Sequence, residues 1–213
     1  MNAILLFGGA SIFLVLGFVL LSNPVKFRSQ RKAADRTEAV INLKEVSFAL
    51  LDFDNDYGRF PDASTIPAVK ANTSTTLALG SSTSNEFFRQ LIAAGTTKNE
   101  MIFWAKSANT PRKPNNSLGA DTLKKGECAF TYIAGLSSSS DPAAPLAAAP
   151  VIPGSWQFDP KPYNGEAVVL RCDGSVKTEP IDKHGNVVIG GISLFDPRQP
   201  YWRGKPPDIK WPE

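Results

Sequence analysis

The 213-residue chain has enough apolar residues, 42% of the total with 13 Phe, to build a hydrophobic core. Its net charge of +3 is concentrated in one place: residues 26–38 hold five basic and two acidic residues, and the remaining chain holds 18 of each sign. A neutral globular part without a basic stripe excludes a typical nucleic-acid-binding domain, so we expect no nucleic-acid partner.

Residues 3–21 form a run of nineteen residues without a charge. As a helix this run is about 28 Å long, close to the thickness of the hydrocarbon core of a bilayer. A cleaved signal peptide is the main alternative, but no basic segment precedes the run and no A-x-A-like cleavage site follows it. A buried core helix is disfavoured because helices of soluble proteins have a polar face. The sequence therefore predicts a single transmembrane anchor at residues 1–23.

Basic residues follow the anchor directly. At a membrane surface such residues contact anionic lipid head groups, which contributes about 1 kcal/mol per residue. We therefore expect a basic membrane-proximal collar of five side chains. The collar consists of Lys26, Arg28, Arg31, Lys32 and Arg36.

A second helix is predicted over residues 24–58. Pro24 removes a helical hydrogen-bond donor and restarts the helix, with Asn23 available as its cap. Apolar residues then recur at steps of three and four, the pattern of one buried helix face, until Gly58 and Pro61 end the helix. Its first turns are expected to stand free and its later turns to pack on a head domain. The predicted packing stripe consists of Ala39, Leu43, Val46, Leu50, Phe53 and Tyr57.

Three aspartates near the end of this helix, Asp52, Asp54 and Asp56, have the alternate spacing of calcium ligands. An EF-hand loop needs glycine at its sixth position and glutamate at its twelfth. Those positions hold Tyr57 and Ala63. We therefore expect acidic residues at a helix end, mostly solvated, and no calcium site.

The head is predicted over residues 59–213, with a short helix around residues 67–71. A capping box formed by Thr83 and Glu86 opens a further helix over residues 85–94, which ends at Gly95. The expected buried side of that helix holds Phe87, Phe88, Leu91 and Ile92.

Strands are expected at residues 101–104 and 128–133, because both segments are rich in aromatic and β-branched residues. The strongest local signal is Asp173-Gly174 between the apolar runs 167–171 and 176–179, which predicts a hairpin with a two-residue turn. A third strand at residues 187–189 would complete a meander. Two proline-containing segments are expected to form no element: residues 137–165, which are poor in large apolar side chains, and the tail from residue 197 onward.

Cys128 and Cys172 are the only cysteines, and their spacing excludes a CxxC redox or zinc motif. They are candidates for one disulfide if the head is periplasmic, or for two buried thiols. The only histidine, His184, lies in a Lys-His-Gly-Asn turn, where a solvated side chain is more usual than a catalytic or metal-binding one. No nucleophile elbow and no glycine-rich phosphate loop occurs. We therefore expect no catalytic, cofactor or metal site and identify no small-molecule substrate.

Residues 31–62, RKAADRTEAVINLKEVSFALLDFDNDYGRFPD, resemble the type IV pilins and type II secretion pseudopilins. The major pseudopilins carry charged residues, K-A-D-R, a long amphipathic helix and an L-D-N-x-x-Y-P-like exit, which here is LDFDNDYGRFP. The resemblance covers the anchor and helix, about a quarter of the chain. It implies an α+β fold in which a long N-terminal helix, a membrane anchor plus an amphipathic half, packs on a small antiparallel β-sheet, with long proline-rich loops.

The hairpin also resembles the H-x9-D-G motif of pilin-like proteins abundant in planctomycetes and verrucomicrobia. Asp173-Gly174 is in place, and Tyr163 stands at the position of the histidine. The chain departs from the pilin pattern elsewhere. It has neither the basic leader ending in glycine nor the F-T-L-I-E motif, and its first acidic residue is Asp35.

The resemblance implies a non-catalytic structural subunit of a type II secretion or type IV pilus-like assembly, a single-pass protein of the inner membrane with its head in the periplasm. Its implied partners are the membrane and other pilin-like subunits, through helix–helix packing. This structural-subunit hypothesis predicts that no pocket holds convergent polar groups. The basic collar after the anchor favours a cytoplasmic head under the positive-inside rule, yet pseudopilins carry basic residues here and export their heads. The alternative is a monomeric, membrane-tethered extracytoplasmic binding module. It predicts an exposed aromatic patch involving Trp156, Tyr163 or Trp202.

Overall fold

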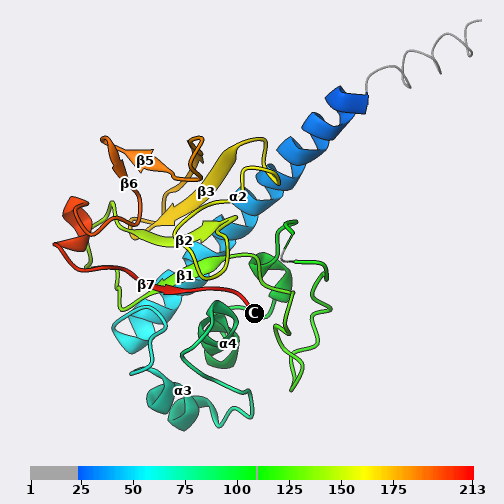
Figure 1. Cartoon of the computed structure of the whole chain (residues 1–213). Coiled ribbons are helices and arrows are strands. Elements are labelled where there is room, and N and C mark those ends of the chain that lie inside the picture. The colour runs from blue at the N-terminus through cyan, green and yellow to red at the C-terminus, as the bar shows by residue number, and fades with distance from the viewer. Residues whose placement is uncertain (1–23, 109) are drawn as a thin grey trace, which may run out of the picture.

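The computed structural model describes residues 24–108 and 110–213, which form an α+β fold (Figure 1). The predicted fold class is confirmed at this level, since three α-helices accompany a five-stranded antiparallel sheet of order β4-β3-β2-β1-β7. The helices are α2 (Pro24–Tyr57), α3 (Ile66–Thr73) and α4 (Ser84–Ala94), with 3₁₀ helices η1 (Glu100–Phe103) and η2 (Pro200–Trp202). The sheet contains β1 (Thr131–Ala134), β2 (Pro145–Ala149), β3 (Glu166–Arg171), β4 (Val176–Pro180) and β7 (Asp208–Lys210). A separate pair consists of β5 (Val188–Ile189) and β6 (Ile192–Ser193).

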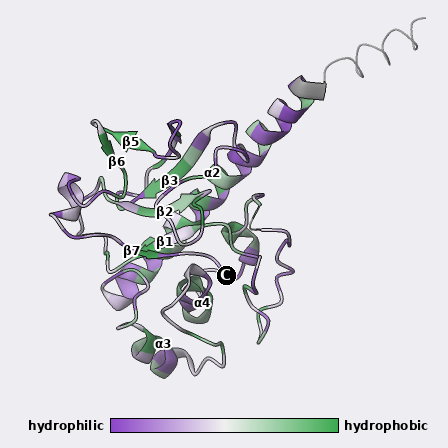
Figure 2. Ribbon diagram, viewed as in Figure 1, coloured by the Kyte–Doolittle hydropathy of each residue, from purple (hydrophilic) through white to green (hydrophobic). Residues whose placement is uncertain are grey.

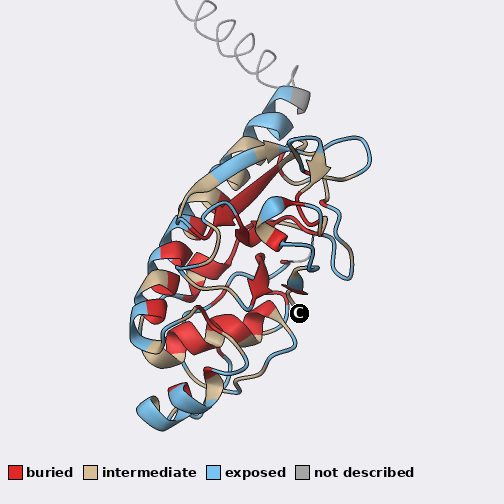
Figure 3. Ribbon diagram, turned by 90° about the vertical axis from the view of Figure 1, so that its left-hand side faces the viewer, coloured by how far each residue is buried: buried red, intermediate tan, exposed pale blue. Residues whose placement is uncertain are grey.

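The long helix α2 has 34 residues and lies against β3, β4, η1 and α4. Five members of the predicted packing stripe are fully buried, and Tyr57 is half-buried and stacks on Phe53 with ring centroids 4.4 Å apart. Figure 3 shows the alternation of buried and exposed turns along the helix. Gly58 ends the helix at a φ of 76°, a left-handed conformation that glycine adopts without strain. The five buried members are Ala39, Leu43, Val46, Leu50 and Phe53.

The C-terminal end of α2 is fixed to the chain that follows β1. Asp54 accepts hydrogen bonds from the hydroxyl of Ser138 at 2.6 Å and from its N–H at 3.3 Å. The prediction that the three aspartates are mostly solvated holds, since Asp52 and Asp56 are exposed, and Asp54 is the buried exception. A buried carboxylate needs hydrogen-bond donors, and Ser138 provides two across 84 residues of sequence.

The capping box of α4 forms as predicted. The Thr83 hydroxyl accepts the N–H of Glu86 at 3.3 Å, and the Glu86 carboxylate accepts the N–H of Thr83 at 3.2 Å. Its buried side contains all four predicted apolar residues, and Phe88 stacks on Phe103 with centroids 4.9 Å apart. Gly95 caps the other end of the helix. Both ends of α4 are therefore set by local sequence.

The β3–β4 hairpin is confirmed, with a turn one residue longer than predicted. The N–H of Gly174 donates to the carbonyl of Arg171 at 3.0 Å, and the N–H of Arg171 donates to the carbonyl of Ser175 at 2.9 Å. The loop is therefore a tight turn followed by a left-handed glycine, which suits the right-handed twist of the strands.

The predicted turn at residues 182–186 and the strand after it form, the strand as β5, but its place as the third strand of a meander is wrong. The chain returns to the sheet only through one isolated bridge, between Ile181 and Val187, and then pairs as β5 with β6. The turn between Ile181 and Val187 is stabilised by the Asp182 carboxylate, which accepts the N–H groups of His184 and Asn186 at 2.8 Å each. These bonds lower the pKa of Asp182, the bond from Asn186 contributing most.

The segment predicted to lie on the surface as an element-free excursion, residues 137–165, instead supplies the central strand of the sheet. β2 is buried along its whole length. Ala147 lies between Tyr132 of β1 and Leu170 of β3, so neighbouring strands provide the large side chains that β2 lacks. A strand paired on both sides can be built of alanine, because burial and hydrogen bonding come from its neighbours.

Two further predictions are wrong. Residues 101–104 lie mostly in η1, not in a strand, because the Asn99 side chain accepts the N–H of Met101 at 3.0 Å and starts a helical turn. The tail forms the edge strand β7, in which Ile209 pairs with Ile133 and is buried. Prolines flank β7 on both sides, in keeping with the edge position where a sheet tolerates them.

Candidate functional site

One side of α2 carries exposed apolar residues and is called here the outer face. Phe27, Ile41 and Phe48 expose 50%, 52% and 70% of their surfaces, and Ala34 is exposed between them. The four positions are spaced by seven residues, which returns to almost the same side of a helix. Figure 2 shows α2 as a mainly hydrophilic helix with apolar positions along its length. Large exposed apolar side chains in a row are typical of a contact surface.

The collar residues occupy the N-terminal half of α2, as their sequence positions require. Lys26, Arg28 and Arg31 are exposed, but Arg36 forms an ion pair with Glu166 at the start of β3. The side-chain amide of Asn164 also donates to the carbonyl of Ser29 at 2.9 Å. Helix α2 therefore contacts the head from Ser29 onward. The sequence predicts that the first turns stand free, so this contact begins closer to the N-terminus than expected.

Three of the collar residues face a cleft of about 370 Å³, called here the basic cleft. Arg28, Arg31 and Lys32 form one wall together with Asp35, at helical steps of three and four. The other walls come from distant parts of the sequence. They are residues 106–108, which contribute Lys106, and the chain before β3, which contributes Asp159, Lys161 and Pro162.

Hydrogen bonds fix both distant walls of the basic cleft. The amide of Asn42 on α2 donates to the carbonyls of Met101 at 3.1 Å and Trp104 at 2.7 Å, which positions the chain that leads to Lys106. The chain before β3 is held by the bond from Asn164 to α2 and by the Asp159 carboxylate, which accepts the N–H of Lys161 at 2.9 Å. The cleft is therefore a defined feature of the fold.

The basic cleft carries an excess of positive charge. Five cationic side chains line it against two carboxylates, Asp35 and Asp159. Among the described residues, none of these five cations forms an ion pair or a side-chain hydrogen bond within the chain. The structural-subunit hypothesis expects no pocket with convergent polar groups, and five cationic residues line this one. The five cations are Arg28, Arg31, Lys32, Lys106 and Lys161.

The two cysteines are free thiols in the core, which is the second of the two alternatives left open by the sequence. Burial raises the pKa of Cys128 to about 11 and that of Cys172 to about 12. The Cys128 sulfur lies 3.6 Å from the Ser84 hydroxyl. A thiol that stays protonated and buried is a poor nucleophile and a poor metal ligand.

The remaining candidates for chemistry are dispersed. His184 is exposed in its turn, and its backbone carbonyl accepts a hydrogen bond from Gln157 at 3.0 Å. Within residues 24–108 and 110–213, no group of three or more His, Cys, Asp or Glu side chains could hold a metal ion. Glu100 is fully buried, and desolvation raises its pKa, but one of its oxygens accepts the N–H of Leu123 at 3.0 Å inside the head. Glu100 does not line the basic cleft.

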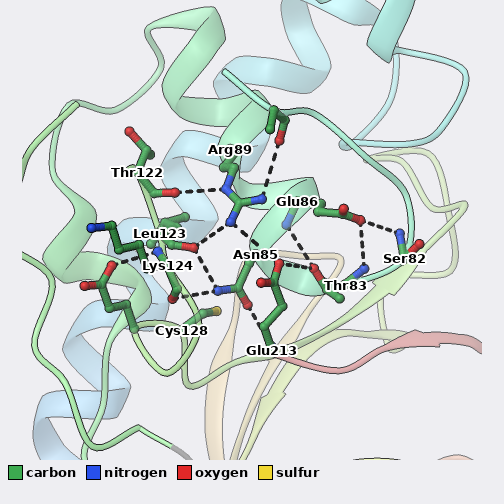
Figure 4. A network of polar contacts seen from close by, with 12 residues as sticks. Ser82, Thr83, Asn85, Glu86, Arg89, Thr122, Leu123, Lys124, Cys128 and Glu213 are labelled. Atoms are coloured by element: carbon green, nitrogen blue, oxygen red, sulfur yellow. Dashed lines mark hydrogen bonds and ion pairs between the residues drawn. The ribbon is translucent and has the colours of Figure 1, made fainter. Parts of the chain in front are cut away.

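A polar network around Arg89 joins α4 to residues 122–124 and to Glu213 (Figure 4). The Arg89 guanidinium donates to the carbonyls of Thr122 at 2.9 Å and Leu123 at 2.8 Å, and lies 3.6 Å from the Glu213 carboxylate. The amide of Asn85 donates to the carbonyl of Leu123 at 3.0 Å. The polar groups of this Arg89 network form hydrogen bonds or ion pairs with one another, so the network stabilises the fold.

The aromatic patch predicted for a binding module does not form as such. Trp156 is 43% exposed, but Tyr163 and Trp202 are buried. The Trp202 indole donates to the carbonyl of Leu194 at 2.9 Å, which fixes it inside the head. Only one of the three named residues is therefore available to a partner.

The sequence could have revealed the outer face, because its spacing of seven residues is visible in the chain. It gave no signal for Lys106 and Lys161, which reach the cleft only through tertiary contacts. Comparison of the chain with protein-family models, curated proteins and solved structures finds no match. In the described part of the chain, no helix combines the length and hydropathy needed to cross a bilayer, and the anchor predicted at 1–23 lies outside the described residues.

Proposed function

We propose that this protein is a membrane-anchored, pilin-like structural subunit of a type II secretion or type IV pilus-like assembly. In this proposal, residues 1–23 anchor it in the inner membrane, the head lies in the periplasm, and the chain performs no catalysis. The proposal rests on one observation above all. A 34-residue helix is buried along one face by the head and leaves the apolar residues Phe27, Ile41 and Phe48 exposed along another.

An exposed apolar row of this length on a helix suits packing against a helix of another subunit, since apolar side chains at such spacing interdigitate with those of a neighbour. Charge supports the same arrangement. The N-terminal half of α2 is basic, whereas the exposed charges of its C-terminal half include Glu45, Asp52 and Asp56. Two copies staggered along the helix axis would bring opposite charges together, which favours one register over others.

Replacing both Ile41 and Phe48 by glutamate is expected to abolish association between copies without unfolding the head. The full-length chain is expressed with two different tags, solubilised in a neutral detergent and purified through one tag. We expect at least about a tenfold loss of the co-purified copy, since buried apolar anchors dominate the affinity of such contacts.

The control is Leu118→Glu with Val188→Glu, which changes two other exposed apolar side chains, each 43% exposed, in segments outside α2. Both double variants should unfold within about 0.5 kcal/mol of the parent, as surface substitutions usually do. Equal co-purification of the Ile41/Phe48 variant and the control would reject the outer face as an assembly surface.

A second candidate function is a monomeric, membrane-tethered extracytoplasmic binding module. The observation that favours it is the basic cleft, which a purely structural subunit does not need. A binding module that contacts its partner through an exposed aromatic patch is disfavoured, because Tyr163 and Trp202 are buried. A parent chain that never co-purifies with its second tagged copy, yet binds a ligand in the basic cleft, would favour this candidate.

A further inference from the structure

We propose that the basic cleft is a binding site for the phosphate group of an amphiphilic ligand. The inference needs neither filament membership nor a particular location of the head. It starts from the five cations that line the cleft without a partner among the described residues. Four of the five are exposed to solvent, which screens their mutual repulsion, and together they create a positive potential that attracts an anion.

The types of side chain favour phosphate. Arg28 and Arg31 each carry a planar guanidinium fork that matches two oxygens of a phosphate group, and lysines add mobile point charges. Asp35 and Asp159 reduce the charge of the cleft but leave it positive, which suits an anion with more than one negative charge. A volume of about 370 Å³ exceeds that of an isolated ion and falls in the range of small-ligand sites.

Apolar surface lies close to the charged groups, since the exposed lining of the basic cleft is itself mostly apolar. A second hollow of about 280 Å³ shares Asp159, Lys161 and Pro162 with the basic cleft. Its other walls include Pro150, Pro153 and Ile152, the last of which is 40% exposed. The ligand expected here therefore carries an apolar group next to its phosphate.

Two sources supply this chemistry: the head group of an anionic phospholipid, and a soluble phosphate compound. The cleft lies beside the N-terminal half of α2, where the chain before β3 is hydrogen-bonded to that helix, and this position suits either source. A ligand from either source would bind through Lys106 and Lys161. No local pattern of the sequence connects these two lysines with the collar.

The test uses the full-length chain in neutral-detergent micelles. Inorganic pyrophosphate is titrated in by calorimetry as the soluble probe, and phosphatidylglycerol is doped into the micelles as the lipid probe, with retained lipid counted by native mass spectrometry. In the double variant Lys106→Gln, Lys161→Gln we expect at least about a tenfold weaker binding of the probe that the parent binds, because two of the cations have been removed.

The control is the double variant Lys183→Gln, Lys205→Gln, which removes the same charge at two exposed lysines without ion pairs among the described residues. Loss of pyrophosphate binding in the cleft variant alone supports a soluble ligand, and loss of retained phosphatidylglycerol in that variant alone supports a lipid head group. Equal binding by both double variants, or no binding of either probe by the parent, overturns the proposal. Neither result depends on whether copies of the chain associate.

Discussion

Replacement of Phe53 by alanine is expected to lower the free energy of unfolding by about 3–5 kcal/mol. Phe53 is fully buried in the packing stripe of α2 and stacks on Tyr57 with centroids 4.4 Å apart. Its removal takes away the apolar surface of a ring and leaves a cavity between α2 and the head. Since domains of this size have total stabilities of about 5–15 kcal/mol, the loss is a large fraction of the whole.

Phe48→Ala is the matched control, because it makes the same change on the same helix at a residue that is 70% exposed. Urea unfolding of the full-length chain in neutral detergent, followed by tryptophan fluorescence, should show a large shift of the midpoint for Phe53→Ala and a shift within about 0.5 kcal/mol for Phe48→Ala. Similar shifts for the two variants would mean that α2 does not pack on the head through the face described here.

Replacement of Arg89 by methionine is expected to lower the free energy of unfolding by about 2–3 kcal/mol. The guanidinium makes charge-assisted bonds to the carbonyls of Thr122 and Leu123 and lies 3.6 Å from Glu213. Methionine retains much of the apolar stem but leaves these groups without their donor. Because the network joins α4 to residues 122–124, hydrogen exchange should accelerate there before it does in β2 or β3.

The control for Arg89 is Arg198→Met. Arg198 also forms an ion pair, with Asp196 at 2.7 Å, but its side chain is 78% exposed, and such surface pairs contribute little. Urea midpoints and hydrogen exchange should therefore be nearly unchanged. If Arg89→Met changed the urea midpoint and hydrogen exchange as little as Arg198→Met, the Arg89 network would be a surface contact without a role in the stability of the head.

The parts of the fold that local sequence determines could be predicted. The buried stripe of α2, its end at Gly58, the capping box of Thr83 with Glu86 and the β3–β4 hairpin all depend on residues within a few positions of one another. Each follows from helical periodicity, side-chain capping or turn chemistry.

The parts that depend on distant neighbours could not be predicted. β2 has the composition of a surface loop and becomes the central strand because Tyr132 and Leu170 flank Ala147 on either side. In the sequence Asp54 resembles a solvated acidic residue, but in the fold its carboxylate accepts a hydrogen bond from Ser138. The basic cleft has the same origin, since Lys106 and Lys161 join the collar only once Asn42 and Asn164 have fixed their segments to α2.

Disulfide cross-linking between single introduced cysteines tests most directly whether α2 meets a second copy through its outer face. Ile41→Cys and Phe48→Cys place thiols on that face, and Lys183→Cys places one in an exposed turn of the head. The native Cys128 and Cys172 can stay, because both are buried. After mild oxidation of membranes that contain the full-length chain, we expect covalent dimers at positions 41 and 48 and only monomer at position 183. Monomer at all three positions, or equal dimer at position 183, would contradict assembly through α2.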